Sequence, residues 1–186
     1  MTVRRALLLV HRWLGLATAP LQLMVGATGV VLLVDLGPAW GDPIAEFHQA
    51  FLGGEFGKWL MFWVSVVAIV LQGTGLWLWW PPQPLRLRTD RGWWRFGYDL
   101  HNLSGILTLP ITVMLAATAV GRGVFREYPP PEAIAIVRTV VSRLHTAGGF
   151  PVAIKVIYAI GSAAYVLQAI TGVMAWWRPQ PSRAPR

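Results

Sequence analysis

The chain has 186 residues, of which 55% are apolar and only 13% are charged, and its formal net charge is +8. This composition is not that of an ordinary soluble domain. Because there is no cysteine, disulfides, iron–sulfur clusters, thiolate zinc sites and covalently attached haem of the Cys-x-x-Cys-His type are excluded. The basic residues flank apolar runs, where membrane topology explains them better than binding to nucleic acid, so no nucleic-acid partner is expected.

Four segments contain no acidic residue, lysine or arginine, and each is long enough to cross a bilayer as a helix. They are residues 13–34, 59–80, 100–120 and 156–177. With their flanking turns they predict helices at about 6–35, 57–80, 97–121 and 151–177. The sequence therefore predicts an all-α membrane protein with four transmembrane helices, in a single transmembrane domain over residues 1–186.

The two connections on the side opposite the termini are short, at about 24 and 35 residues. The first contains Gly37-Pro38 and Gly53-Gly54, and the sequence predicts a loop there. The second contains an amphipathic stretch at about residues 131–147, in which apolar residues at 134, 137, 141 and 144 form one stripe. We expect this stretch to be a short helix along the outer surface.

The distribution of basic residues predicts the orientation. Ten lysines and arginines fall on the side of the two termini and the middle loop, against six on the other side. Eight of the eleven tryptophans also fall near the terminal side, as in an interfacial aromatic belt. By the positive-inside rule, both termini and the middle loop are expected in the cytoplasm, and lipid is the expected surrounding.

The chain contains an internal repeat. HRWLGLATAP (11–20) aligns with HNLSGILTLP (101–110) at an offset of 90, and LMVGATGV (23–30) aligns with VMLAATAV (113–120) at the same offset. TGLWLWWPPQP (74–84) aligns with TGVMAWWRPQP (171–181) at an offset of 97. The fold class expected is thus a tandem, parallel repeat of a two-helix unit, with units at 1–84 and 91–181 and an axis along the membrane normal.

All four histidines are related by this repeat: His11 with His101, and His48 with His145. A pseudo-twofold axis would bring each pair face to face at one depth. Zinc and copper sites usually need three or four ligands, whereas haem iron needs only two axial imidazoles, so the pattern favours haem. Gly15 and Gly105 follow the first pair by one helical turn. They either leave room for a flat macrocycle or permit close helix contact, and both readings stay open.

These motifs resemble the PepSY-associated transmembrane family of bacterial inner-membrane proteins, which includes ferric-siderophore reductases. The resemblance rests on LLVHRWLGL, FHQAFLGGEFGKWL, YDLHNLSGILTLP, RLHTAGGF and ITGVMAWWRP, in this order. It implies two b-type haems and transfer of electrons across the inner membrane. Carried onto this chain, His11 and His101 would ligate a cytoplasmic haem iron, and His48 and His145 an outer one.

Longer members of that family carry sizeable periplasmic insertions, which the short connections here do not provide. No phosphate loop, nicotinamide or flavin motif is present. The Thr-Gly pairs at 74–75 and 171–172, each followed by tryptophans, are expected to serve helix packing and interface anchoring.

Two classes of function stay open. One is a dihaem electron carrier that takes electrons from quinol or from a membrane or cytoplasmic reductase and passes them to an outer ferric chelate. The other is a non-catalytic scaffold or accessory subunit of a larger membrane complex.

Overall fold

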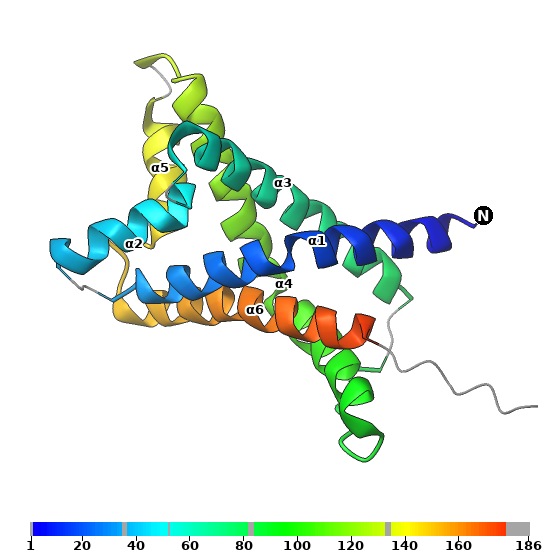
Figure 1. Ribbon diagram of the computed structural model, residues 1–186. Helices are drawn as coiled ribbons and strands as arrows, with labels where there is room; N and C mark the ends of the chain where they lie inside the picture. Colours follow the sequence, from blue (N-terminus) through cyan, green and yellow to red (C-terminus); the bar gives the residue numbers. More distant parts are fainter. Residues whose placement is uncertain (1, 35–36, 52, 82–83, 133–134, 178–186) are drawn as a thin grey trace, which may run out of the picture.

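The computed structural model describes residues 2–34, 37–51, 53–81, 84–132 and 135–177. These residues form six helices and no β-strand (Figure 1). The helices are α1 (Val3–Val31), α2 (Pro38–Ala50), α3 (Gly54–Trp79), α4 (Gly92–Glu127), α5 (Ala135–Thr146) and α6 (Val152–Trp176). The predicted all-α class is confirmed for the part of the chain that the structure describes.

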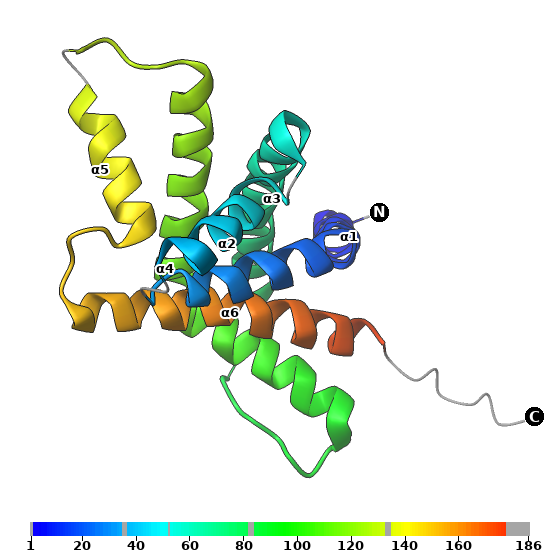
Figure 2. The same cartoon turned by 60° about the vertical axis from the view of Figure 1, so that its left-hand side comes forward.

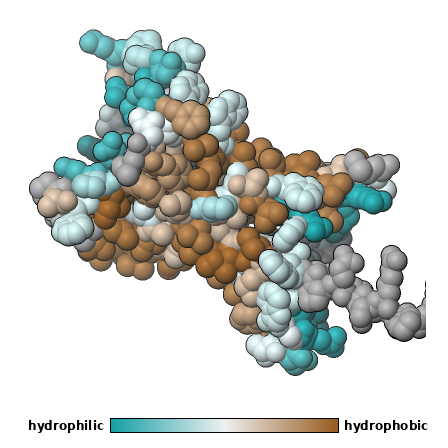
Figure 3. Space-filling view, viewed as in Figure 1, coloured by the Kyte–Doolittle hydropathy of each residue, from teal (hydrophilic) through white to brown (hydrophobic). Residues whose placement is uncertain are grey.

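Four of the helices, α1, α3, α4 and α6, are long and apolar enough to cross a membrane. They have 29, 26, 36 and 25 residues, and the mean hydropathy of their most apolar stretches lies between 1.5 and 1.9. Large apolar side chains such as Trp63, Leu107 and Ile160 are exposed on them. Figure 3 shows apolar residues across the middle of the molecule and hydrophilic ones gathered at its extremities. The protein is therefore a multi-pass membrane protein whose outer surface suits lipid.

The four spanning helices form a ring in the order α1, α3, α4, α6, in which each helix packs against two others. Consequently α1 and α4 are diagonal to each other, and so are α3 and α6. The start of α1 and the end of α6 lie on one side (Figures 1 and 2). Arg4 in α1 donates to the Leu78 carbonyl at the end of α3, and Trp94 near the start of α4 donates to the Ala175 carbonyl of α6. We call this side the terminal side and the other the distal side.

Small residues allow the helices to approach closely. A Cβ atom added at Gly26 of α1 would lie 2.7 Å from the carbonyl oxygen of Ser162 in α6. One added at Gly161 of α6 would lie 2.6 Å from a side-chain carbon of Ile111 in α4. Membrane helices associate through such close packing, because lipid provides no hydrophobic drive to bring apolar surfaces together.

Helix α2 is the main difference from the expected organisation, since the sequence predicts a loop there. Gly37 and Pro38 begin the helix: Gly37 has φ +67°, and the fixed φ of proline suits the first helical position. Phe51 ends it in a left-handed conformation, and its N–H donates to the Phe47 carbonyl at 2.8 Å. The turn residues are therefore the boundaries of a 13-residue helix rather than signs of a continuous loop.

Other boundaries also differ from those expected. Helix α4 begins at Gly92 and continues to Glu127, beyond the expected 97–121 at both ends. Helix α1 ends at Val31. Helix α5 occupies Ala135–Thr146, inside the expected 131–147, and Ile134 of the predicted apolar stripe lies outside the described residues.

The two distal helices fold back onto the bundle, where α2 packs on α3 and α1, and α5 packs on α4. Their C-terminal corners are tight. Ala50 is 3% exposed, Ala147 is fully buried, and a Cβ atom at Gly57 would lie 1.7 Å from the Ala50 carbonyl oxygen. These corners direct the C-terminal ends of α2 and α5, which carry His48 and His145, toward the spanning helices.

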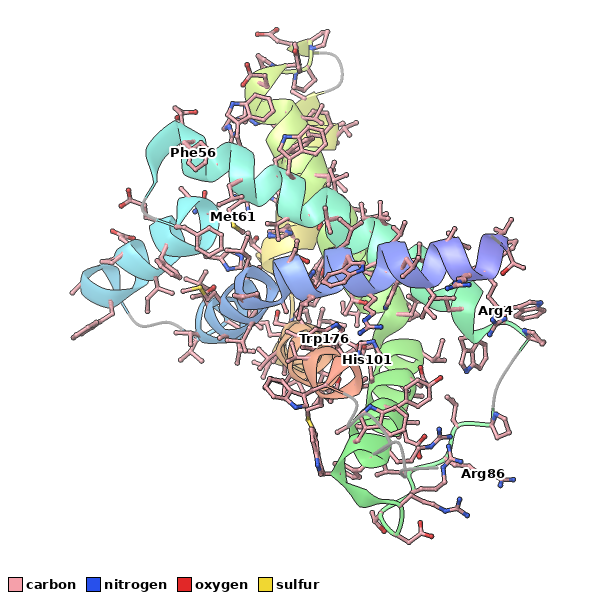
Figure 4. The ribbon with its side chains drawn as sticks, turned by 45° about the vertical axis from the view of Figure 1, so that its right-hand side comes forward. Arg4, Phe56, Met61, Arg86, His101 and Trp176 are labelled. Atoms are coloured by element: carbon pink, nitrogen blue, oxygen red, sulfur yellow. The ribbon has the colours of Figure 1, made fainter. Side chains whose placement is uncertain are left out.

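The connection between α3 and α4 is fastened to the bundle by a buried carboxylate. The side chain of Asp99 is only 3% exposed and accepts two bonds of 2.8 Å from the guanidinium of Arg88. The Arg88 backbone N–H and, at 3.3 Å, Nε of Arg95 also face this carboxylate. Arg86, in contrast, is exposed and projects away from the bundle (Figure 4).

Candidate functional site

The four histidines lie in two facing pairs, one at each of two levels of the bundle. His11 of α1 and His101 of α4 have ring centroids 6.2 Å apart, with an angle of 81° between the rings. His48 of α2 and His145 of α5 have centroids 6.3 Å apart, at 46°. The structure thus brings together the same pairs that the repeat predicts by depth. We call them the terminal pair and the distal pair.

Each imidazole is bonded through Nδ1 to a threonine of a neighbouring helix. The bonds are His11 to Thr74 (2.9 Å), His101 to Thr171 (3.1 Å), His48 to Thr28 (2.8 Å) and His145 to Thr118 (3.1 Å). Every one of these threonines also donates its hydroxyl proton to the carbonyl four residues earlier, at 2.6–2.8 Å. All four sites are therefore built in the same way.

This arrangement determines which ring nitrogen carries the proton. Because the threonine proton is used within its own helix, the hydroxyl oxygen can only accept from the imidazole, so Nδ1–H is the donor. Nε2 then carries the lone pair. Histidines that bind metal ions commonly have the other ring N–H held in this manner, which fixes the tautomer and the ring orientation. All four imidazoles thus share one tautomer, in which Nε2 is the nitrogen able to bind a metal ion.

The spacing within each pair suits a single metal ion between the rings. A metal–imidazole bond of about 2 Å on either side of one ion separates two ring centroids by about 6 Å. The measured separations are 6.2 and 6.3 Å. No group of three or more His, Cys, Asp or Glu able to hold a metal ion occurs among the described residues. Each site therefore offers two protein ligands.

Glycines lie against the terminal pair, but not those singled out from the sequence. A Cβ atom at Gly75 of α3 would lie 3.2 Å from Cε1 of His11, and one at Gly172 of α6 would lie 3.4 Å from Cε1 of His101. Gly15 faces the Leu71 side chain of α3 at 3.8 Å, and Gly105 faces the Gln168 side chain of α6 at 3.3 Å. Gly15 and Gly105 thus face neighbouring helices, and Gly75 and Gly172 leave room for the rings.

The threonines and these two glycines are site residues that sequence reasoning missed. Thr74-Gly75 and Thr171-Gly172 were assigned to helix packing, and Thr28 and Thr118 received no role. All of them are related by the repeat offsets of 90 and 97. The repeat offsets therefore indicate that these residues are equivalent in the two halves of the chain. Only the tertiary contacts show that they lie against the histidines.

The distal pair lines a cavity of about 280 Å³. Small residues from the spanning helices form much of its wall, including Gly26, Gly29, Ser65, Ala68, Ala119 and Ser162. Arg122 and Tyr158 also line it. Burial, and secondly the charge of Arg122, lowers the pKa of His48 to about 4 and that of His145 to about 3. Both imidazoles are therefore neutral at pH 7 and able to bind a metal ion.

The two levels are well separated along the spanning helices. His11 and Thr28, the partner of His48, are 17 residues apart in α1, which corresponds to about 25 Å of helix. His101 and Thr118 have the same separation in α4. Thr28 precedes the end of α1 by three residues. The sequence places His48 and His145 beyond the spans, whereas the folding back of α2 and α5 brings them level with the last turn of α1.

These features define a class: a four-span helical membrane protein with two facing histidine pairs at different depths. Residues 36–124 match the family model described as PepSY-associated TM region. This match runs from α2 through most of α4 and confirms the resemblance seen in the sequence motifs. Comparisons with curated proteins and with solved structures found no significant match.

Proposed function

We propose that the protein binds two b-type haems and carries electrons between the two sides of the membrane. His11 and His101 ligate the terminal haem, and His48 and His145 ligate the distal haem. The observation that carries this proposal is the occurrence, at both levels, of two imidazoles about 6 Å apart, each with Nδ1 bonded to a threonine. Bound haem supplies an iron ion that gains and loses single electrons.

The number of protein ligands supports haem over a bare metal ion. Zinc and copper sites usually take three or four protein ligands, whereas a porphyrin supplies four nitrogens and leaves two axial positions for imidazoles. Gly75 and Gly172 keep side chains away from the rings of the terminal pair, and small residues line the cavity at the distal pair.

We infer that the chain is a tandem repeat of a two-helix unit, over residues 1–84 and 91–181. A twofold axis along the membrane normal would exchange α1 with α4 and α3 with α6, which agrees with the order of the ring. The same exchange relates the four histidine–threonine bonds in two pairs. The bond of His11 to Thr74 corresponds to that of His101 to Thr171, and the bond of His48 to Thr28 corresponds to that of His145 to Thr118. The distal helices follow the twofold exchange less closely. Helix α2 packs mainly on α3, so the exchange would place α5 on α6, whereas α5 packs on α4.

We also infer that the terminal side faces the cytoplasm of a bacterial cell and that the membrane is the inner one. The excess of basic residues on that side supports this orientation, and the family supports the compartment. Electrons then enter from quinol or from a membrane or cytoplasmic reductase at the terminal level. They leave at the distal level to an external ferric chelate, whose iron takes up one electron and becomes ferrous.

The first experiment is a visible spectrum and a pyridine haemochrome assay on the purified protein. We expect two haem b per chain with reducible low-spin bands. His11→Ala and His101→Ala should each remove the terminal haem, and His48→Ala and His145→Ala the distal one. Gln49→Ala, next to His48 on α2 and at the same cavity, is the matched control and should retain both haems.

A colourless preparation would contradict this function and leave the scaffold or accessory subunit as the remaining class. One haem per chain would limit the proposal to a single site. The direction of transfer is tested in right-side-out vesicles with reduced protein. An impermeant ferric chelate should oxidise both haems there, and this oxidation should be lost in His48→Ala.

A further inference from the structure

Two buried indole N–H groups have no acceptor among the residues that the structure describes. They are Nε1 of Trp79, the last residue of α3, and Nε1 of Trp176, the last residue of α6. A buried donor left without a partner costs about 1–3 kcal/mol, and native structures rarely contain one. The two positions are related by the repeat offset of 97. The acceptor for this matched pair of donors therefore lies outside the described residues.

Both indoles lie next to the terminal pair. Trp79 follows Gly75 by four residues and Trp176 follows Gly172 by four, so each is one turn nearer the terminal side on the same helix face. Gly75 and Gly172 are the glycines that face Cε1 of His11 and of His101. The donors therefore flank the imidazoles from the two diagonal helices α3 and α6.

The charge around these donors favours an anion. The guanidinium of Arg12 lies 5.7 Å from the ring centroid of Trp176. Trp79 lines a cavity of about 360 Å³ with Arg86, Arg88, Arg95 and Asn102, and Asp99 is the one carboxylate in its wall. Indole N–H groups are donors only, so their partner must be a hydrogen-bond acceptor. A carboxylate or a phosphate meets both requirements.

We propose that the N–H groups of Trp79 and Trp176 donate hydrogen bonds to the two propionate carboxylates of the terminal haem. This inference rests on the proposed function, which places that haem between His11 and His101. Two donors on diagonal helices match two carboxylates on one ligand. The bonds fix the rotation of the haem about its two axial ligands. They also offset negative charge near the iron and so raise its reduction potential.

The test is a redox titration of the terminal haem in Trp79→Phe, in Trp176→Phe and in the double variant, because phenylalanine keeps an aromatic ring and removes the N–H. At a fixed potential we expect each substitution to shift the ratio of ferric to ferrous haem two- to tenfold toward ferric, or about 20–60 mV. The distal haem is the internal reference and should not change. Trp77→Phe is the matched control, since Trp77 lies in the same helix and is 61% exposed.

A second arm identifies the acceptor. Apoprotein is loaded with haem b or with its dimethyl ester, in which both propionates are neutral. With the ester, Trp79→Phe and Trp176→Phe should have no further effect on the terminal potential, because the carboxylate charge is already absent. A shift that persists with the ester would mean that the indoles bond to something else, such as a lipid phosphate, and would overturn the inference.

The outcomes separate this inference from the function on which it rests. A protein without haem would refute the proposed function and this inference with it, whereas absence of the terminal haem alone would refute this inference and limit the proposed function to the distal site. Two haems with an unchanged terminal potential in both variants would refute the inference alone. If a phenylalanine variant loses the terminal haem, Trp79→His and Trp176→His, which keep a ring N–H, should restore it. Failure of both to do so would point to packing and overturn the proposal.

Discussion

At the scale of single residues, the threonine hydroxyls distinguish these imidazoles from ordinary polar residues at helix ends. An interfacial histidine satisfied by water would be free to adopt either tautomer. Here the threonine gives its proton to its own helix and accepts from Nδ1, as in the bonds of Thr74 to Val70 and to His11. The same chemistry occurs four times. The hydroxyl thus keeps Nε2 available as a ligand.

Removing one hydroxyl should weaken one site only. Thr74→Val keeps the shape of the side chain but deletes the acceptor for His11, so we expect the affinity of the terminal site for haem to fall about 10–100-fold. Thr28→Val should do the same at the distal site. The measurement is a haem titration of the apoprotein by visible absorption, with each site monitored in a variant that lacks the other.

Thr108→Val is the control for the threonine variants. Thr108 also donates to a carbonyl one turn back, that of Ser104, but its side chain bonds to no histidine among the described residues. Its replacement should leave both affinities within twofold. If Thr74→Val and Thr108→Val had equal effects, the bond to His11 would have no role in binding.

The buried distal histidines predict a pH dependence for the haem-free protein. The pKa of His48 is lowered to about 4 by burial first and by the charge of Arg122 second, whereas an unfolded histidine titrates near 6.5. The unfolded state therefore binds more protons between these values, so the contribution of His48 is complete above pH 6.5 and is lost as the pH falls toward 4. The loss is on the order of 3 kcal/mol.

Chemical unfolding in detergent, followed by tryptophan fluorescence, would measure this dependence. We expect the free energy of unfolding to decrease between pH 6.5 and pH 4.5, and to decrease less in His48→Gln. An unfolding free energy that stays constant over this interval would show that His48 is accessible to protons in the folded protein.

At the scale of elements, the two distal helices determine the depth of the distal pair. His48 and His145 follow the first and third spans in sequence and would lie outside the membrane if their connections were extended. Instead, α2 and α5 fold back and set these residues against Thr28 and Thr118. The tight corner between Ala50 and Gly57 makes this possible for α2. The position of the distal site thus depends on backbone packing at a corner.

Gly57→Ala should disrupt this corner. The added Cβ would lie 1.7 Å from the Ala50 carbonyl oxygen, which forces α2 away from α3 and moves His48. We expect loss of the distal haem with retention of the terminal one, measured by the pyridine haemochrome assay and the visible spectrum. Gly73→Ala is the control in the same helix, because nothing lies within 4 Å of its added Cβ. It should keep both haems and gain up to about 1 kcal/mol of stability.

At the scale of the whole molecule, the proposed repeat and the four spans give the two faces of the membrane different chemistry. The terminal side carries the basic loop that Asp99 fastens to α4, and the distal side carries α2 and α5. Two haem levels about 25 Å apart along α1 would lie near opposite faces of a hydrocarbon core about 30 Å thick. A route for electrons across the membrane would need both levels.

Single cysteines in the Cys-free chain report the orientation directly. Asp42 and Arg86 are both exposed, and they lie on the distal and on the terminal side, respectively. In intact cells an impermeant maleimide should label Asp42→Cys and not Arg86→Cys, because the proposed orientation places the basic loop in the cytoplasm. After permeabilisation both should react. Labelling of Arg86→Cys alone in intact cells would reverse the orientation and the proposed direction of electron transfer.

Much of the fold could be read from sequence because it depends on local rules. The apolar length of residues 59–80 is sufficient to predict α3, and the offset of 97 is sufficient to pair His48 with His145. Helix α2 could not be read in this way. Glycine and proline stand at its boundaries, and these residues are also typical of loops. The helix packs on α1 and α3, and these tertiary contacts cannot be read from the local sequence.

The sequence by itself determined the number of spanning helices and which histidines face each other, because hydropathy and repeat register are properties of the chain alone. The tertiary structure decided the position of the distal pair along the spanning helices. It also decided which glycines face the imidazole rings and which threonines are hydrogen-bonded to them. It also revealed two indole donors without acceptors. These features depend on distances between helices that are far apart in sequence, such as that between His11 and Thr74. Side-chain contacts of this kind follow from packing geometry and have no local signature.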